Sequence, residues 1–339
     1  NFGTGASIFY TTGGATAAID KDYTVSNATA GTNASTSVLV GTNGSTVKVE
    51  SGKTLETGTN VGLIAIKGTT SSTALNDGTI KSTRDNNGIG IYTTDGSIGT
   101  NSSTGTITMQ NKNAVGIFAK NNGTTHTAEN LGKIVLGKAD GTTTHESLIA
   151  MFAQAEAGKT ASVKNTGTID VNTKKSVGMY AKNDATNVGD VDLQNTETIN
   201  VNNTGSAGIY APKANISKVG KIKLKDSDIT NGSSAVYISE GGKVSDTSSA
   251  DINLGKVNQN RVAYYVNGAN STLSGSNIGK ITGYGVGVYL QGNSATDKAK
   301  IDNTTPTLNY KAVSGTTGNG IIGLFLNGAT DIQSYNKGI

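Results

Sequence analysis

The sequence predicts an all-β fold, a right-handed parallel β-helix, and three observations point to it. A glycine–aliphatic–aromatic motif recurs along the chain, and nine steps from Ile64 to Phe325 make the repeat roughly 29 residues. A second motif, with alternating apolar and polar residues, falls at a nearly fixed place between successive copies. The composition is polar yet keeps evenly spaced β-branched residues, which suits a solenoid with a thin apolar axis. The length accommodates about 12 coils.

The first strand of each repeat carries the aromatic residue that serves as its anchor. Clear copies of the motif are Gly90-Ile91-Tyr92, Gly116-Ile117-Phe118, Gly178-Met179-Tyr180, Gly208-Ile209-Tyr210, Gly287-Val288-Tyr289 and Gly323-Leu324-Phe325. Looser copies place anchors at Phe9, Ile64, Phe152, Tyr237 and Tyr265, with Leu39 filling a gap near the start.

Side-chain alternation in this strand leaves its parity open. One face carries Val177, Met179 and Ala181, and the other carries Gly178 and Tyr180. We expect the aliphatic set to point inward, because it buries three apolar residues per strand, and the aromatics to form an external ladder. The alternative, with the aromatics inside, would spare the phenylalanines from solvent.

The second strand of each repeat has the period-two pattern of a strand with one buried face, as in Gly167-Thr168-Ile169-Asp170-Val171. A third, weaker strand precedes it, as in Ala161-Ser162-Val163. Turn asparagines such as Asn165, Asn195 and Asn303 are expected to adopt left-handed backbone conformations and to stack into amide ladders.

Composition excludes several classes of protein. The 28 Lys and Arg against 24 Asp and Glu give a net charge of +4, and the scattered lysines form no block that could follow a phosphate backbone, so nucleic acid is not an expected partner. The absence of cysteine excludes disulfides and thiolate metal sites. No run of apolar residues is long enough for a transmembrane helix. We expect residues 1–339 to form one β-helical segment, an excerpt of a longer protein.

No catalytic, cofactor or metal site is predicted, and the chain is not expected to be an enzyme. The acidic pairs Asp190/Asp192 and Asp226/Asp228 resemble general acid–base pairs, but solvated surface acids are the simpler interpretation. The two histidines, His126 and His145, fall in one long repeat and lack the partners of a metal site.

Partner contacts are expected where the repeat lengthens, because solenoids carry function on insertions. The longer steps place loop insertions near 139–146 and 300–314. Candidate partner-binding residues are Tyr10 and Tyr264, which lie outside the anchor pattern, and His145 and Tyr310, which lie in the two insertions.

Residues 165–171, Asn-Thr-Gly-Thr-Ile-Asp-Val, and 176–183, Ser-Val-Gly-Met-Tyr-Ala-Lys-Asn, resemble repeats of the passenger domains of large fusobacterial type V autotransporter adhesins, the RadD-like group. The resemblance covers essentially the whole chain and implies an extracellular passenger at the outer membrane. It implies membrane attachment only through a C-terminal β-barrel outside this sequence. It also implies binding to a host-cell receptor or glycan, or to partner bacteria.

The sequence therefore predicts a cell-surface adhesin segment, monomeric and without a cofactor, that binds protein or glycan partners from a β-helical stalk. Two alternatives stay open. The segment is a purely structural spacer, or it is a carbohydrate-active β-helix enzyme.

Overall fold

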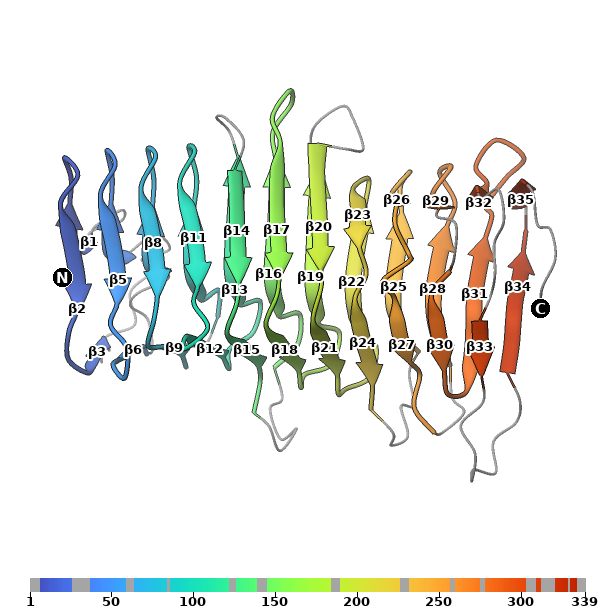
Figure 1. The fold of residues 1–339 in the computed structure, drawn as a ribbon, viewed down its shortest axis with the longest axis horizontal. Helices are drawn as coiled ribbons and strands as arrows, with labels where there is room; N and C mark the ends of the chain where they lie inside the picture. The colour runs from blue at the N-terminus through green and yellow to red at the C-terminus, as the bar shows by residue number, and fades with distance from the viewer. Residues whose placement is uncertain are drawn as a thin grey trace.

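The computed structural model describes residues 7–25, 37–58, 64–83, 86–121, 126–138, 145–183, 190–225, 232–256, 260–274, 278–302, 309–311, 321–328 and 330–333. Every element in this part of the chain is a β-strand. The strands form three parallel sheets that wind around a common axis, two with twelve strands and one with eleven. The coils stack into a rod with the two termini at opposite ends (Figure 1). The predicted β-helix of about 12 coils is confirmed.

We call the three sheets A, B and C in the order in which each coil visits them. Sheet A comprises β1 (Ser7–Thr11), β4 (Ser37–Gly41), β7 (Ile64–Gly68), β10 (Ile89–Thr93), β13 (Val115–Asn121), β16 (Ile149–Ala155), β19 (Val177–Asn183), β22 (Ala207–Pro212), β25 (Ser233–Ser239), β28 (Arg261–Asn267), β31 (Gly285–Gln291) and β34 (Ile321–Asn327). Sheet B comprises β2 (Thr16–Ile19), β5 (Thr46–Val49), β8 (Thr73–Asn76), β11 (Ile98–Asn101), β14 (His126–Asn130), β17 (Ala161–Asn165), β20 (Val191–Asn195), β23 (Asn215–Lys218), β26 (Lys243–Val244), β29 (Thr272–Ser274), β32 (Ala299–Asp302) and β35 (Thr330–Gln333). Sheet C comprises β3 (Tyr23–Val25), β6 (Thr54–Thr57), β9 (Thr79–Ser82), β12 (Thr106–Met109), β15 (Lys133–Leu136), β18 (Thr168–Val171), β21 (Thr198–Val201), β24 (Lys221–Leu224), β27 (Asp251–Asn253), β30 (Lys280–Thr282) and β33 (Asn309–Lys311).

Most strands of sheets B and C alternate between buried and partly exposed residues, as the period-two motif predicts. In sheet C, Ile107 pairs with Ile134, and Ile134 pairs with Ile169, so equivalent side chains form one buried column. Each such side chain contributes about 1.5–3 kcal/mol of hydrophobic stabilisation. A thin column of this kind holds a polar chain together because every coil adds the same few apolar residues.

Sheet A breaks the alternation, and this corrects the predicted parity. In β19 both Gly178 and Met179 are buried, whereas Val177 and Tyr180 lie on the outer face. The glycine makes this possible, since a Cβ atom at Gly178 would lie 2.6 Å from the carbonyl oxygen of Gly208. The expectation that Val177 points inward is therefore wrong, while Met179 and Ala181 are buried as predicted.

The external aromatic ladder is confirmed. Neighbouring ring centroids lie 4.5 to 5.3 Å apart along the row Tyr92, Phe118, Phe152, Tyr180, Tyr210, Tyr237, Tyr265, Tyr289 and Phe325. Such ring pairs add about 0.5–1.5 kcal/mol each beyond their buried area.

The first coils have a different register from the one predicted. Tyr10 pairs with Val40, Val40 with Lys67 and Lys67 with Tyr92, so Tyr10 belongs to the aromatic row. The predicted anchors Phe9, Leu39 and Ile64 are wrong. Phe9 and Leu39 lie in the row that continues through Ile66 to the buried Ile91. Ile64 lies in the row of Ile89, with which it pairs.

A ladder of buried asparagines runs along the turn between sheets B and C. The side-chain amides of Asn76, Asn101, Asn130, Asn165 and Asn195 are linked in that order by hydrogen bonds of 2.7, 2.7, 2.7 and 2.8 Å. The predicted amide ladder is confirmed for Asn165 and Asn195, but neither residue has a positive φ, so the left-handed conformation was wrong. Asn303 lies outside the described residues.

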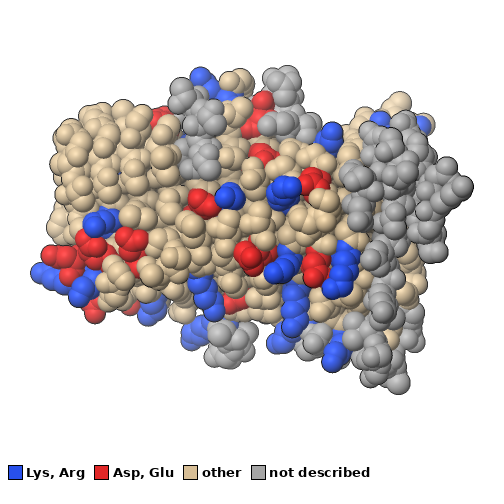
Figure 2. All heavy atoms as spheres, in the orientation of Figure 1, with Lys and Arg blue, Asp and Glu red and all other residues tan. Residues whose placement is uncertain are grey.

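Charged side chains on the outer faces pair between neighbouring coils. Lys133 lies 3.0 Å from Asp170, and Lys164 lies 3.1 Å from Glu129. Figure 2 shows acidic and basic residues interspersed on the face in view. In the described part of the chain no helix is long and apolar enough to cross a membrane.

Candidate functional site: a groove beside the tyrosine ladder

A row of apolar side chains runs beside the aromatic ladder on the outer face of sheet A. The row includes Ile89, Val115, Ile149, Val177, Ala207, Ser234, Val262 and Val286. Two consecutive coils, β22 and β25, carry the small residues Ala207 and Ser234 where the coils on either side carry valine. Both residues line a groove of about 530 Å³, which also includes Val177 and Val262 of the flanking coils.

The aromatic side of the groove is formed by Tyr210, Tyr237 and Tyr265. Two of the three phenol oxygens accept hydrogen bonds from the next coil, Tyr237 from Asn267 Nδ2 at 3.2 Å and Tyr210 from Ser239 Oγ at 3.5 Å. Burial raises the pKa of Tyr237 and of Tyr265 above the ordinary value. These rings therefore stay uncharged at neutral pH.

The ladder changes orientation within the groove. The planes of Tyr210 and Tyr237 differ by 14°, but those of Tyr237 and Tyr265 differ by 85°. Tyr265 then stacks on Tyr289 at 23°. The groove thus lies where two stacked series of rings meet edge to face.

The opposite side of the groove is formed by the turns that lead from sheet C into sheet A. A chain of buried serines holds these turns. Ser176 Oγ accepts from the backbone of Leu148, Ser206 Oγ from that of Ser176, and Ser233 Oγ from that of Ser206, at 3.1, 3.1 and 3.3 Å. This wall is therefore fixed before any partner arrives.

Lys175 is the charged residue in the lining of the groove, where its side chain passes Gly205. It forms an ion pair of 2.8 Å with Glu146. The hydrogen bond from Lys175 lowers the pKa of Glu146, and the nearby charges of Lys175, Lys112 and Lys174 lower it further. This edge of the groove is basic among the described residues.

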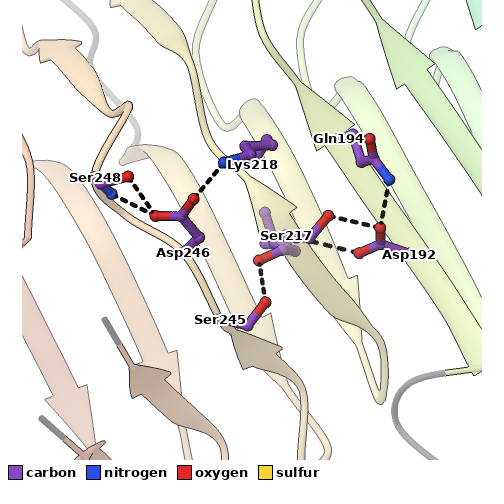
Figure 3. A network of polar contacts seen from close by, with 8 residues as sticks. Asp192, Gln194, Ser217, Lys218, Ser245, Asp246 and Ser248 are labelled. Atoms are coloured by element: carbon purple, nitrogen blue, oxygen red, sulfur yellow. Dashed lines mark hydrogen bonds and ion pairs between the residues drawn. The ribbon is translucent and has the colours of Figure 1, made fainter. Parts of the chain in front are cut away.

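A polar network on the outer face of sheet B lies beside an irregularity in the strand pairing (Figure 3). The pairing of β20 with β23 shifts register between Leu193 and Gln194. Asp192 lies beside this shift and accepts hydrogen bonds from Gln194 at 2.8 Å, Asn215 at 2.8 Å and Ser217 at 2.6 Å. Its carboxylate is saturated by the chain's own donors, which favours a structural role in stabilising the bulge.

Asp246, two coils further on than Asp192, is expected to make stability depend on pH. Hydrogen bonds from Lys218 and Ser248 lower the pKa of its carboxyl from 3.8 to about 2. A depressed pKa in the folded state stabilises the fold above the unfolded value, and that contribution is lost as the pH falls through the folded value. Wild type should therefore be more stable than Asp246→Asn at neutral pH. Urea titrations at a series of pH values should show the difference shrinking from pH 3.8 towards 2, and a pH-independent difference would contradict this assignment.

The predicted partner-binding residues do not converge on the groove. Tyr264 pairs with Val236 and Val288, is 1% exposed, and donates a hydrogen bond to the carbonyl of Ile278 at 3.1 Å. It is a core residue, so its assignment to a partner surface was wrong. Tyr10 is 63% exposed at the first coil, and His145 is half-buried near Glu146.

The remaining candidates fall partly or wholly outside the described residues. The side chains of His126 and Tyr310 are not described, nor are Asp226, Asp228 and most of the predicted loops 139–146 and 300–314. Within the described residues, no group of three or more His, Asp or Glu side chains could hold a metal ion.

The sequence carried a signal for the groove that our reasoning missed. Ala207 and Ser234 stand one residue before the glycine position of the motif, where most other copies have Ile or Val. Because we had placed that position in the core, a small residue there indicated nothing about the surface.

One family model matches part of the chain. Residues 82–212 match the model described as the BigA third pectate lyase-like domain, and BigA is a bacterial autotransporter-like adhesin. Over these coils the chain is therefore similar to an adhesin-type β-helix passenger. The match gives no support to the narrower fusobacterial group. No curated protein and no solved structure matches the chain.

Proposed function

We propose that this chain is a passenger segment of a bacterial cell-surface adhesin and that it binds its partner through the groove in sheet A. The observation that carries the proposal is the local departure from the repeat. From β7 to β31 this row carries Ile or Val except at Ala207 and Ser234, where the groove lies, and the first two coils, β1 and β4, carry Ser7 and Ser37 at the same position. The similarity of residues 82–212 to an adhesin domain supports the same function.

The wider setting is also a proposal. The passenger lies outside the cell at the outer membrane, acts as a monomer, and contacts a host-cell receptor or partner bacteria. The regular coils with their interspersed charges act as a stalk, because paired charges of both signs keep the outer faces of the sheets polar and well hydrated.

A carbohydrate-active enzyme is the less favoured alternative. The described lining of the groove has one charged side chain, Lys175, and no carboxylate pair of the kind that glycoside hydrolysis needs. We therefore propose a binding role without catalysis and without a cofactor.

Adhesion of the purified chain tests the proposed function. The folded protein, immobilised on a surface, should retain epithelial cells or bacteria of other species, and soluble protein should compete for them. The heat-unfolded protein on the same surface provides the control, because it presents the same composition without the groove. If the folded protein retains no more cells than the unfolded control for every cell type tested, the adhesin proposal is wrong and the structural-spacer alternative is favoured.

A further inference from the structure

The hollow in the groove lies over the two small residues of the row. Its floor is Ala207 and Ser234, and its two ends are Val177 and Val262 in the same row. A partner atom placed there contacts Tyr210 and Tyr237 on one side and the serine-linked turns on the other. Such a preformed, open and mostly apolar depression offers a place for an anchor side chain of a partner.

Two of the polar groups around the hollow, the hydroxyls of Ser206 and Ser233, are engaged within the chain. Ser206 Oγ donates to the carbonyl of Thr173 at 2.9 Å, and Ser233 Oγ accepts from the Ser206 backbone at 3.3 Å. Tyr237 accepts from Asn267, as described above. More of the exposed lining is apolar than polar, so a sugar ring would pair fewer of its hydroxyls here than in water, and each unpaired buried hydroxyl costs about 1–3 kcal/mol. The lining therefore favours an apolar guest over a glycan.

The charge beside the hollow selects among protein partners. Lys174 and Lys175 are exposed on the turn that borders the groove, and Lys112 lies close enough to help lower the pKa of Glu146. Lys175 is ion-paired with Glu146, so the positive excess of this described edge comes from Lys174, the exposed neighbour of Lys175 on the same turn. Acidic residues in a partner would complement it, whereas basic ones would be repelled.

We propose that the groove binds an extended acidic segment of a protein partner that inserts one apolar side chain, aliphatic or aromatic, between β19 and β28. The proposal rests on the proposed adhesin function and names the chemistry of its partner. The apolar side chain fills the space over Ala207 and Ser234, and flanking Asp or Glu residues lie against Lys174 and Lys175.

A random peptide library displayed on phage tests the proposal. Peptides are selected on the wild-type chain and counter-selected on the double variant Ala207→Val/Ser234→Val, called the filled variant, which adds methyl groups to the floor of the groove. Both substitutions restore the residue found in neighbouring coils, so the variant is expected to fold as well as wild type. Enriched peptides should carry Leu, Ile, Phe or Trp beside Asp or Glu, and the double variant should bind them about tenfold to a hundredfold more weakly.

Two further variants separate the parts of the site. Val115→Ile adds a methyl group in the same row of a coil outside the groove, between Ile89 and Ile149, and should leave peptide binding unchanged. Lys174→Ala/Lys175→Ala should weaken binding at low salt and reduce its dependence on salt.

Several results would overturn the proposal. These are no enrichment, enriched peptides without acidic residues, equal affinity for wild type and the filled variant, or binding on a glycan array that the filled variant loses. The last result would assign the groove to a sugar. If cells adhere equally to wild type and to the filled variant, the inference fails while the adhesin function stands. If peptides bind the groove but no cells adhere, the adhesin function fails instead.

Discussion

Gly132→Ala is expected to destabilise the chain by about 3 kcal/mol, because the glycine stands where two coils touch through their backbones. A Cβ atom on Gly132 would lie 2.2 Å from the carbonyl oxygens of both Gly105 and Ser102. Neither oxygen belongs to a side chain that can rotate away, so the turn itself must shift. The shift would strain the hydrogen bond from Lys133 N to Gly105 O, now 3.0 Å. Denaturant unfolding followed by circular dichroism measures the loss.

Gly158→Ala is the matched control for this substitution. Gly158 has a φ of 72°, but a Cβ atom there would meet nothing within 4 Å. Its substitution should therefore cost only the penalty of a left-handed alanine, about 1–2 kcal/mol. In a later coil the equivalent position is occupied by Glu197, so the turn there accommodates a Cβ atom. If Gly132→Ala unfolds at the same denaturant midpoint as wild type, the turn at Gly132 can make the same adjustment, and the prediction is wrong.

The sequence predicted the coil architecture because periodicity depends on many residues at once. The Gly-Thr-Ile or Gly-Lys-Ile motif places Ile80, Ile107, Ile134 and Ile169 at equivalent positions, and one buried column is the consequence. The register of the first coils could not be predicted in the same way. Lys67 occupies the aromatic position beneath Tyr92, and a lysine gives no anchor signal. The strand pairing reveals the row, because it continues through Val40 to Tyr10.

The parity of sheet A depends on a feature that simple alternation does not describe. Gly178 and Met179 both point inward, which shifts every earlier residue of the strand to the other face. A strict period of two therefore assigns Val177 and Ala207 to the core. The groove follows from that shift, so it became visible only when the structure placed Ala207 beside Tyr210 on the outside. Tyr264 was misassigned for a related reason, since two adjacent tyrosines conceal which of them occupies the buried row.

The asparagine ladder gives the second large effect, since each amide after Asn76 is both donor and acceptor in a buried chain. Asn130 Oδ1 accepts from Asn101 at 2.7 Å, and Asn130 Nδ2 donates to Asn165 at 2.7 Å. Asn130→Leu is nearly isosteric but leaves the facing groups of both neighbours without this partner. We expect a loss of about 2–3 kcal/mol in the free energy of unfolding, because buried polar groups that lose hydrogen bonds keep their desolvation cost.

Asn76→Leu tests whether the loss comes from the ladder or from asparagine as such. Asn76 stands at the end of the row and makes one ladder contact, from its Nδ2 to Asn101 Oδ1 at 2.7 Å. It is as buried as Asn130, so the two substitutions gain the same apolar burial. Breaking one link should cost about 1–2 kcal/mol. Equal losses at the two positions in parallel urea titrations would mean that each amide serves only its own turn. A larger loss at Asn130 would mean that the amides of successive coils stabilise one another.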